Sequence, residues 1–248
     1  MIVLKSAEEL SVMREAGRIT AATLRRVGEA VRPGVTTGEL DELAETFIRG
    51  EGAVPAFKGY HGFPGTLCTS VDGEVVHGIP GARRLLEGQI LSVDCGAIVE
   101  GYYGDSAMTF PVGAVAADAR RLMDVTRDSL HAGIAKCIPG MRLHDISAAV
   151  QSVAEAAGFA VVREYVGHGI GRSMHEDPQV PNYGRAGTGP TLKAGMVFAI
   201  EPMINAGGAA VRSLDDGWTV VTEDGGLSAH FEHTVAVTDD GPMILTLE

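Results

Sequence analysis

The sequence predicts an α+β fold, in which an antiparallel sheet core is covered by helices and arises by internal duplication. Two observations lead to this prediction. Two helical patterns followed by strand patterns occur twice along the chain, an order typical of α+β folds rather than of alternating parallel ones. A Leu-x-x-Gly segment that runs through apolar residues to an acid also occurs twice, at residues 85–94 and 192–201. The acids at the two ends, Asp94 and Glu201, are 107 residues apart.

The duplication extends to two shorter motifs. Pro33-Gly34 has a counterpart in Pro139-Gly140, and His77-Gly78-Ile79-Pro80 has one in His175-Glu176-Asp177-Pro178. A Pro-Gly pair ends helices in many unrelated proteins, so the first match is weak by itself. Three matches in the same order favour a true repeat. We therefore expect one domain over residues 1–248, made of related halves at roughly 1–112 and 113–248.

The elements follow the same scheme in each half. The first helix begins at the capping box Ser6-Ala7-Glu8-Glu9 and ends before Pro33-Gly34. The second begins at the box Thr36-x-x-Glu39 and ends near residue 50. In the second half, helical patterns cover residues 117–137 and 143–157. Strand patterns follow each helix pair, at residues 66–70, 90–94 and 103–110, and then at 160–165, 197–203, 218–222 and 229–238.

Composition narrows the class of protein. With 248 residues, 45% of them hydrophobic, the chain can bury a large core. Its net charge of −12 argues against non-specific nucleic-acid binding. Three cysteines without a Cys-x-x-Cys pair argue against a disulfide framework and a thiolate zinc site. Because no signal peptide or membrane-spanning run is found, we expect a soluble, cytoplasmic protein with no membrane partner.

Two carboxylates flank a predicted turn at Val99-Glu100-Gly101. These are Asp94 and Asp105, and a hairpin centred on the turn would set them nearly opposite each other. Opposed residues in a hairpin have Cβ atoms about 5 Å apart. Carboxylates this close repel each other unless a proton or a cation lies between them. Taken alone, Asp105 after Gly104 is better explained as a simple turn residue.

Three further residues have the character of metal ligands. Glu201 ends a buried strand, where a lone carboxylate is costly, and Glu232 lies in a later strand. His168 is surrounded by glycines in Gly167-His168-Gly169-Ile170-Gly171, which leave its ring accessible. Four carboxylates and one imidazole suit two divalent ions (Co, Mn, Fe or Zn) about 3.5–4 Å apart. Such a pair activates a water, so this set indicates metal-assisted hydrolysis.

With these residues in place, the chain resembles a type I methionine aminopeptidase of the short, bacterial-like form without an N-terminal extension. The resemblance covers nearly the whole length. It implies the pseudo-twofold pita-bread fold, which agrees with the duplication, and removal of methionine from nascent polypeptides whose second residue is small. The motifs that carry it are Glu74-Val75-Val76-His77-Gly78-Ile79-Pro80, Asp94 with Asp105, Gly167-His168-Gly169-Ile170-Gly171 with His175-Glu176-Asp177-Pro178-Gln179-Val180, Ile200-Glu201-Pro202, and Glu232-His233-Thr234.

The resemblance also implies roles for the five ligand candidates. Asp94 would hold one ion, and His168 and Glu201 would hold the other. Asp105 and Glu232 would bridge the two ions. Glu201 would additionally pass protons to and from the bridging water.

Outside the metal shell, the resemblance implies two catalytic histidines and a methionine pocket. His77 would contact the substrate, with a core role as its alternative, and His175 would donate to the scissile carbonyl or its oxyanion. Two pocket positions depart from residues frequent in the family, Phe63 from a tyrosine and Met174 from an aromatic, so we expect an altered pocket shape. An ordinary core is the alternative for the expected pocket residues, which are Tyr60, Phe63, Cys68, Met174 and Trp218.

Two other functions compete with this one. An Xaa-Pro aminopeptidase of the same fold usually carries an additional N-terminal domain, and fewer than 100 residues precede Asp94. A non-catalytic pita-bread protein that binds peptide N-termini would have lost ligands, whereas all five are present. The expected partners are nascent chains near the ribosome exit, and the expected state is a monomer. The sequence does not define the physiological metal, a ribosome-docking surface or a second isoform.

Overall fold

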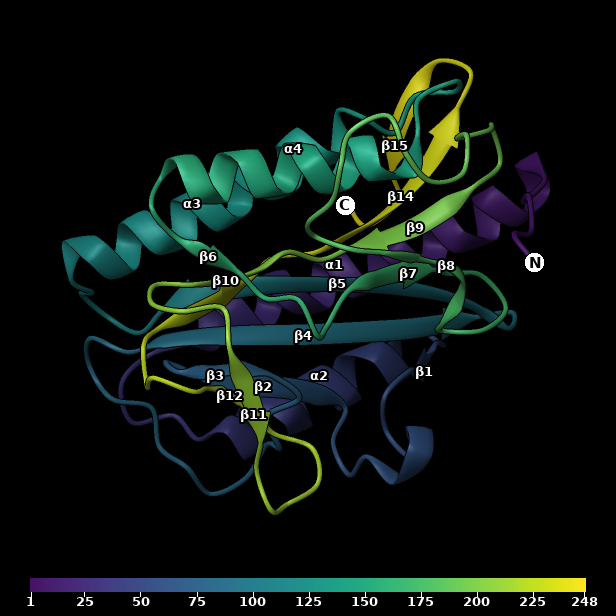
Figure 1. The fold of residues 1–248 in the computed structure, drawn as a ribbon. Helices are drawn as coiled ribbons and strands as arrows, with labels where there is room; N and C mark the ends of the chain where they lie inside the picture. Colours follow the sequence, from purple (N-terminus) through teal and green to yellow (C-terminus); the bar gives the residue numbers. More distant parts are fainter.

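Two pairs of helices pack against the strands of the molecule (Figure 1). The computed structural model describes residues 1–248, and all four predicted helices are present. Both capping boxes form, since Ser6 and Glu9 exchange hydrogen bonds at the start of the first helix, and Thr36 and Glu39 do so at the start of the second. None of the helices is both long and apolar enough to span a bilayer. The helices are α1 (Ala7–Ala30), α2 (Thr37–Gly50), α3 (Ala117–Ile134) and α4 (Leu143–Ala156).

A long antiparallel hairpin crosses the middle of the molecule (Figure 1). It consists of β4 (Ile90–Val99) and β5 (Tyr102–Pro111), and α1 packs across both strands. The strands β1 (Val54–Pro55) and β2 (Leu67–Val71) pair with β4, again antiparallel. The strands predicted at residues 66–70, 90–94 and 103–110 are confirmed, with β4 continuing beyond its predicted end.

The register of this hairpin differs by two residues from the one that would set the two acids opposite each other. Asp105 pairs with Gly96, and Asp94 pairs with Ala107, so the two carboxylates are diagonal neighbours rather than directly opposed. The reason is a tight two-residue turn at Glu100-Gly101, in which both residues have positive φ (49° and 80°). The two acids still project from the same face, because positions two apart on a strand share a face.

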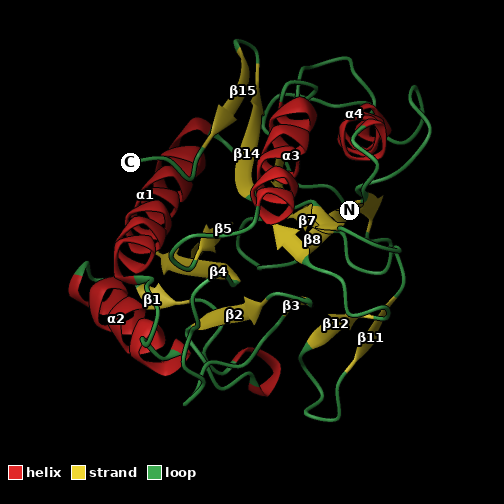
Figure 2. Cartoon of the chain, turned by 90° about the vertical axis from the view of Figure 1, so that its left-hand side faces the viewer, coloured by secondary structure: helices red, strands yellow, loops and turns green.

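The second large sheet has five antiparallel strands in the order β15-β14-β9-β7-β8. Its inner strand β9 contacts α3. In Figure 2, α1 and α2 lie on the left of the strands, and α3 and α4 lie at the upper right. The strands are β7 (Gly167–Gly169), β8 (Glu176–Val180), β9 (Val197–Ile200), β14 (His233–Thr238) and β15 (Gly241–Ile244).

Two small antiparallel sheets complete the architecture. One has the order β13-β10-β6, with strands Ser228–His230, Met203–Asn205 and Ala160–Val161. The other has the order β11-β12-β3, with strands Val211–Ser213, Val220–Thr222 and Glu74–Val76. Because β3 precedes α3 and β12 follows it, this second sheet ties the early and late parts of the chain together.

Two strands predicted as continuous are interrupted, and a third is shorter than expected. The pattern at 197–203 divides into β9 and β10 at Glu201-Pro202, and the pattern at 229–238 divides into β13 and β14 at Phe231-Glu232. Proline cannot donate to a strand ladder, which explains the first break. The pattern at 160–165 yields only β6. Both breaks place a glutamate where the chain passes from one sheet to another.

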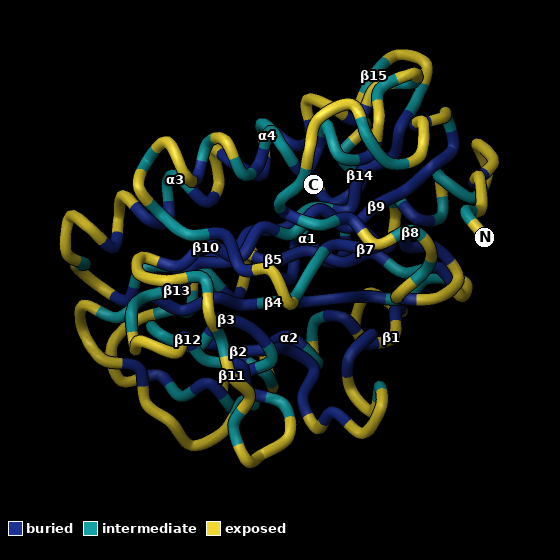
Figure 3. The backbone as a smooth tube through the Cα atoms, in the orientation of Figure 1, coloured by how far each residue is buried: buried dark blue, intermediate teal, exposed yellow.

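The apolar core is divided into two main clusters, one beside each pair of helices. One cluster of buried side chains lies against α1 and α2 and includes Leu24, Leu40 and Val93. Another lies against α3 and α4 and includes Leu122 and Phe198. Figure 3 shows that β9 and most of β4, which lead to the two repeated acids, are buried.

Candidate active site

The sequence-predicted site residues all line one cavity of about 200 Å³. They come from both halves of the chain, although the most distant members are more than 150 positions apart in sequence. Four residues not expected from the sequence complete the lining: Phe57, Val76, Tyr165 and Val166. The predicted members are Tyr60, Phe63, Cys68, His77, Asp94, Asp105, His168, Met174, His175, Glu201, Trp218 and Glu232.

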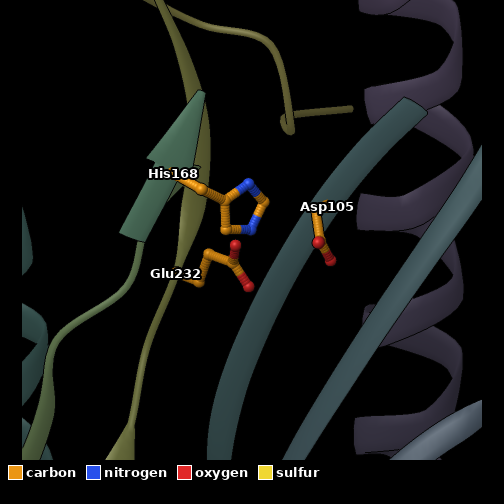
Figure 4. A group of neighbouring side chains, drawn as sticks. All are labelled: Asp105, His168 and Glu232. Atoms are coloured by element: carbon orange, nitrogen blue, oxygen red, sulfur yellow. The ribbon is translucent and has the colours of Figure 1, made fainter. Parts of the chain in front are cut away.

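Three of these side chains form a compact buried cluster. Asp105 on β5, His168 on β7 and Glu232 between β13 and β14 have potential ligand atoms that all lie within 4.8 Å of one another. Figure 4 shows the His168 ring and the Glu232 carboxylate projecting toward Asp105 from the opposite side. Oxygen and imidazole donors at this separation can hold a divalent ion of the first transition row.

The other two expected ligands adjoin this cluster. Glu201 Oε1 lies 3.5 Å from Nε2 of His168. Asp94 lies beside Asp105 on the same face of the β4–β5 hairpin. The break at Glu201-Pro202 ends β9 at this point, so that Glu201 enters the cavity instead of continuing in the sheet.

Carboxylate oxygens of the cluster and of the neighbouring Asp94 fit a metal ion. Asp94 Oδ1, Asp105 Oδ1 and Glu232 Oε1 are buried and have no hydrogen-bond partner within the chain. A buried carboxylate oxygen without a partner is costly unless a cation or proton satisfies it. Several such oxygens facing one cavity are therefore suited to divalent cations.

Burial and mutual repulsion keep protons on these acids when no cation is present. Burial raises the pKa of Asp105 to about 7. Burial, followed by repulsion from Asp105, raises the pKa of Asp94, Glu201 and Glu232 well above ordinary carboxyl values. A raised pKa is typical of buried carboxyl groups whose negative charge no neighbouring positive charge stabilises.

His168 is poised as a neutral nitrogen donor. Burial, and secondly the neighbouring His175, lower its pKa to about 4, so the ring carries no charge at neutral pH. Its Nδ1 donates a hydrogen bond to the carbonyl oxygen of Gly169 at 2.9 Å. This fixes the proton on Nδ1 and leaves the Nε2 lone pair facing Glu201 and the cluster.

An apolar pocket adjoins the cluster. Phe63 and Trp218 contact edge to face, with ring centroids 5.0 Å apart. Cys68 and Met174 are buried in the same apolar group, and Tyr60 packs against it. These side chains line the cavity and also pack on one another. Each of them therefore belongs both to the apolar core and to the wall of the pocket.

The two histidines expected to act on the substrate differ in exposure. The ring centroid of His175 lies 4.3 Å from that of His168, and His175 is otherwise exposed. His77 is half-buried and packs edge to face on Tyr165. Burial, and secondly His175, lower the pKa of His77 to about 4, while burial, and secondly His61, lower the pKa of His175.

One residue beside the site was not among the sequence candidates. His230 ends β13, is only 1% exposed, and has its Nε2 3.6 Å from Oε2 of Glu201. Burial, and secondly His77, lower its pKa to about 3. Its position two residues before Glu232 was the only sequence signal, and that signal does not reveal the contact with Glu201.

Comparison with known proteins gives a consistent result. The sequence matches Metallopeptidase family M24 over residues 11–239. It is 54% identical over 246 residues to methionine aminopeptidase 1 of Bacillus subtilis, with 99% of each chain covered. The crystal structure of methionine aminopeptidase from Rickettsia prowazekii superposes with a TM-score of 0.98, at 47% identity and 100% coverage of both chains. The prolidase from Pyrococcus furiosus has a TM-score of 0.78 at 21% identity, with 66% of that chain covered, which shows a shared fold alone.

Proposed function

The chain belongs to metallopeptidase family M24, among its methionine aminopeptidases, and from this we propose that it hydrolyses N-terminal methionine from nascent polypeptides whose second residue is small. It has the pita-bread fold of that family. The observation that supports the proposal most is the convergence of the predicted ligands, catalytic histidines and pocket residues on one cavity. Residues of both halves are needed to build that cavity, so we also propose that the chain acts as a single domain.

The buried acid and imidazole cluster binds divalent metal. We propose two ions, drawn from Co, Mn, Fe or Zn, because four clustered carboxylates carry more negative charge than one divalent ion offsets. In this arrangement Asp94 would hold one ion, and His168 and Glu201 would hold the other. Asp105 and Glu232 would serve both ions, and a bound cation would satisfy the buried oxygens that lack hydrogen bonds.

The protein groups divide the chemistry among them. When bound, the ions polarise the scissile carbonyl and lower the pKa of a nearby water. With a cation bound, Glu201 would be ionised and could accept a proton from that water and return it to the departing amine. His175 donates a hydrogen bond to the carbonyl oxygen as negative charge develops there. His77 contacts the peptide beside the reacting bond.

The pocket supplies specificity. The methionine thioether fits a soft, apolar slot with aromatic walls, here formed by Phe63, Trp218 and the side chains packed beside them. The peptide beyond the first residue must enter a cavity of about 200 Å³, so a large second side chain would clash. We propose that the enzyme acts in the cytoplasm, as a monomer, on chains emerging from the ribosome.

The proposal is tested by metal content and peptide hydrolysis together. Protein purified anaerobically should contain two divalent ions and cleave Met-Ala-Ser, and chelation should lower the rate at least 100-fold, with recovery on adding Co²⁺ or Mn²⁺. Met-Leu-Ser should be cleaved much more slowly. Faster hydrolysis of Ala-Pro than of Met-Ala-Ser would instead identify an Xaa-Pro peptidase. Peptide binding that survives chelation without any hydrolysis would identify a binding protein.

A further inference from the structure

His230 occupies a buried position that its backbone contacts fix firmly. Its backbone N–H donates to Oγ1 of Thr109 at 2.9 Å, and that hydroxyl donates in turn to the His230 carbonyl oxygen at 2.8 Å. His230 also pairs with Met203 between β13 and β10. Held by β5 on one side and β10 on the other, the ring has little freedom to leave its place.

The ring nitrogen Nε2 of His230 is left without a hydrogen-bond partner, although the residue is 1% exposed. Leaving a buried polar atom unpaired is costly, and such atoms in folded proteins usually have a role. The carboxylate atom that lies near it is Oε2 of Glu201, at 3.6 Å. A shift of a few tenths of an ångström would bring the two atoms within hydrogen-bond distance.

Glu201 therefore lies between two imidazoles, one near each oxygen. His168 Nε2 is 3.5 Å from Oε1, and His230 Nε2 is 3.6 Å from Oε2. The two rings are not equivalent, because His168 belongs to the compact cluster with Asp105 and Glu232, whereas His230 stands outside it. His168 can thus share a cation with Oε1, while His230 faces the other oxygen.

We propose that His230 is a positioning residue, whose Nε2–H donates to Oε2 of Glu201 and thereby aims Oε1 at the metal cluster. Partners outside the ligand shell commonly orient ligands in this way, and losing one typically weakens metal binding 10- to 100-fold. The inference rests on the proposed function only in taking Glu201 as a ligand.

The first experiment compares two variants of nearly equal shape. His230→Gln retains an N–H donor, whereas His230→Met does not. Mn²⁺ affinity of the metal-free proteins is measured by calorimetry, after circular dichroism confirms that they are folded. The Met variant should bind Mn²⁺ 10- to 100-fold more weakly than wild type, and the Gln variant should stay within about threefold of it. His144→Met, which changes a histidine bonded to Thr188 instead, is the matched control and should leave Mn²⁺ affinity unchanged.

The second experiment gives a result even if the His230→Met variant does not fold. Nitrogen-15 NMR of the Mg²⁺- or Zn²⁺-loaded wild type, assigned with His230→Gln, should show His230 protonated on Nε2. Protonation on Nδ1, coordination of Nε2 to the metal, or equal Mn²⁺ affinity in the Met variant and wild type would each overturn the inference. Weak binding in the Gln variant equal to that of the Met variant would also overturn it. Neither readout involves a peptide, so a failure to cleave Met-Ala-Ser contradicts only the proposed function.

Discussion

The phenolic oxygen of Tyr60 lies 2.8 Å from Nδ1 of His175, joining the two halves of the chain at the exposed rim of the cavity. Burial, and secondly the neighbouring Tyr103, raise the pKa of Tyr60, so the phenol stays protonated and donates. Because the pKa of His175 is lowered by burial, its ring is neutral and holds one proton. An Nδ1 that accepts from Tyr60 leaves this proton on Nε2, where a donor to the substrate carbonyl is needed.

Tyr60→Phe should therefore lower kcat for Met-Ala-Ser about tenfold, because one hydrogen bond worth about 1–1.5 kcal/mol no longer fixes the tautomer. KM should change less, since the aromatic ring remains in the pocket. Tyr103→Phe is the control, because Tyr103 packs on the same apolar group without bonding His175. Steady-state kinetics of both variants decide the matter, and equal kcat in Tyr60→Phe and wild type would contradict the tautomer argument.

Metal binding by the metal-free protein should release protons. A carboxyl group with a raised pKa keeps its proton at a pH where an ordinary one is ionised, and an incoming cation must displace that proton. With the pKa of Asp105 at about 7 and that of Glu232 well above its ordinary value, both because of burial, Mn²⁺ affinity should fall as pH decreases from 8 to 6. The expected slope is about tenfold per pH unit for each proton displaced.

Calorimetry in buffers of different ionisation enthalpy measures the number of protons released. A titration in which the apparent heat does not depend on the buffer, and the affinity does not depend on pH, would mean that the acids are already ionised. Asp239→Asn serves as a control, because it removes an exposed carboxyl that does not line the cavity.

Much of the fold could be predicted from the sequence, because the signals that start and end its helices involve residues close together in the chain. The capping boxes at Ser6 and Thr36 involve residues three apart, and they mark the helix starts without help from the rest of the chain. The repeat that ends at Asp94 and Glu201 identified the two strands that lead into the site. The five metal-ligand candidates were predictable from residue chemistry and the repeat, whereas the place of His77, His175 and the pocket residues in the same cavity was predictable only through the resemblance to a known family.

The features that were missed depend on tertiary contacts. The turn at Glu100-Gly101 requires positive φ at a glutamate, which local propensity disfavours, so the hairpin register was misplaced. Short strands such as β3 pair with partners distant in sequence and carry no periodic signal of their own. His230 was missed because its significance lies in its approach to Glu201, which only the packing of separate sheets produces.

Two buried thiols offer a test of the pocket. Cys68 on β2 lines the cavity, whereas Cys95 on β4 lies in the core of the first half. Cys68→Ala should raise KM for Met-Ala-Ser about 3- to 10-fold, since the pocket loses a polarisable contact to the methionine side chain. Cys95→Ala should leave KM unchanged and lower the free energy of unfolding by about 1 kcal/mol. Kinetics and urea unfolding separate the two effects, and a similar KM change in both variants would remove Cys68 from the pocket.

The close packing of α1 on the hairpin gives the final prediction. A Cβ atom on Gly104 would lie 2.6 Å from the backbone nitrogen of Gly17, a distance that neither backbone can accommodate without moving. Gly104→Ala should therefore lower the free energy of unfolding by about 1–3 kcal/mol, as overpacking usually does. Because Asp105 is the next residue, the displaced strand should also weaken Mn²⁺ binding. Gly50→Ala is the matched control, since a Cβ there meets nothing within 4 Å, and it should leave both urea unfolding and metal affinity close to wild type. Wild-type stability in Gly104→Ala would mean that α1 and β5 are less tightly packed than their backbones indicate.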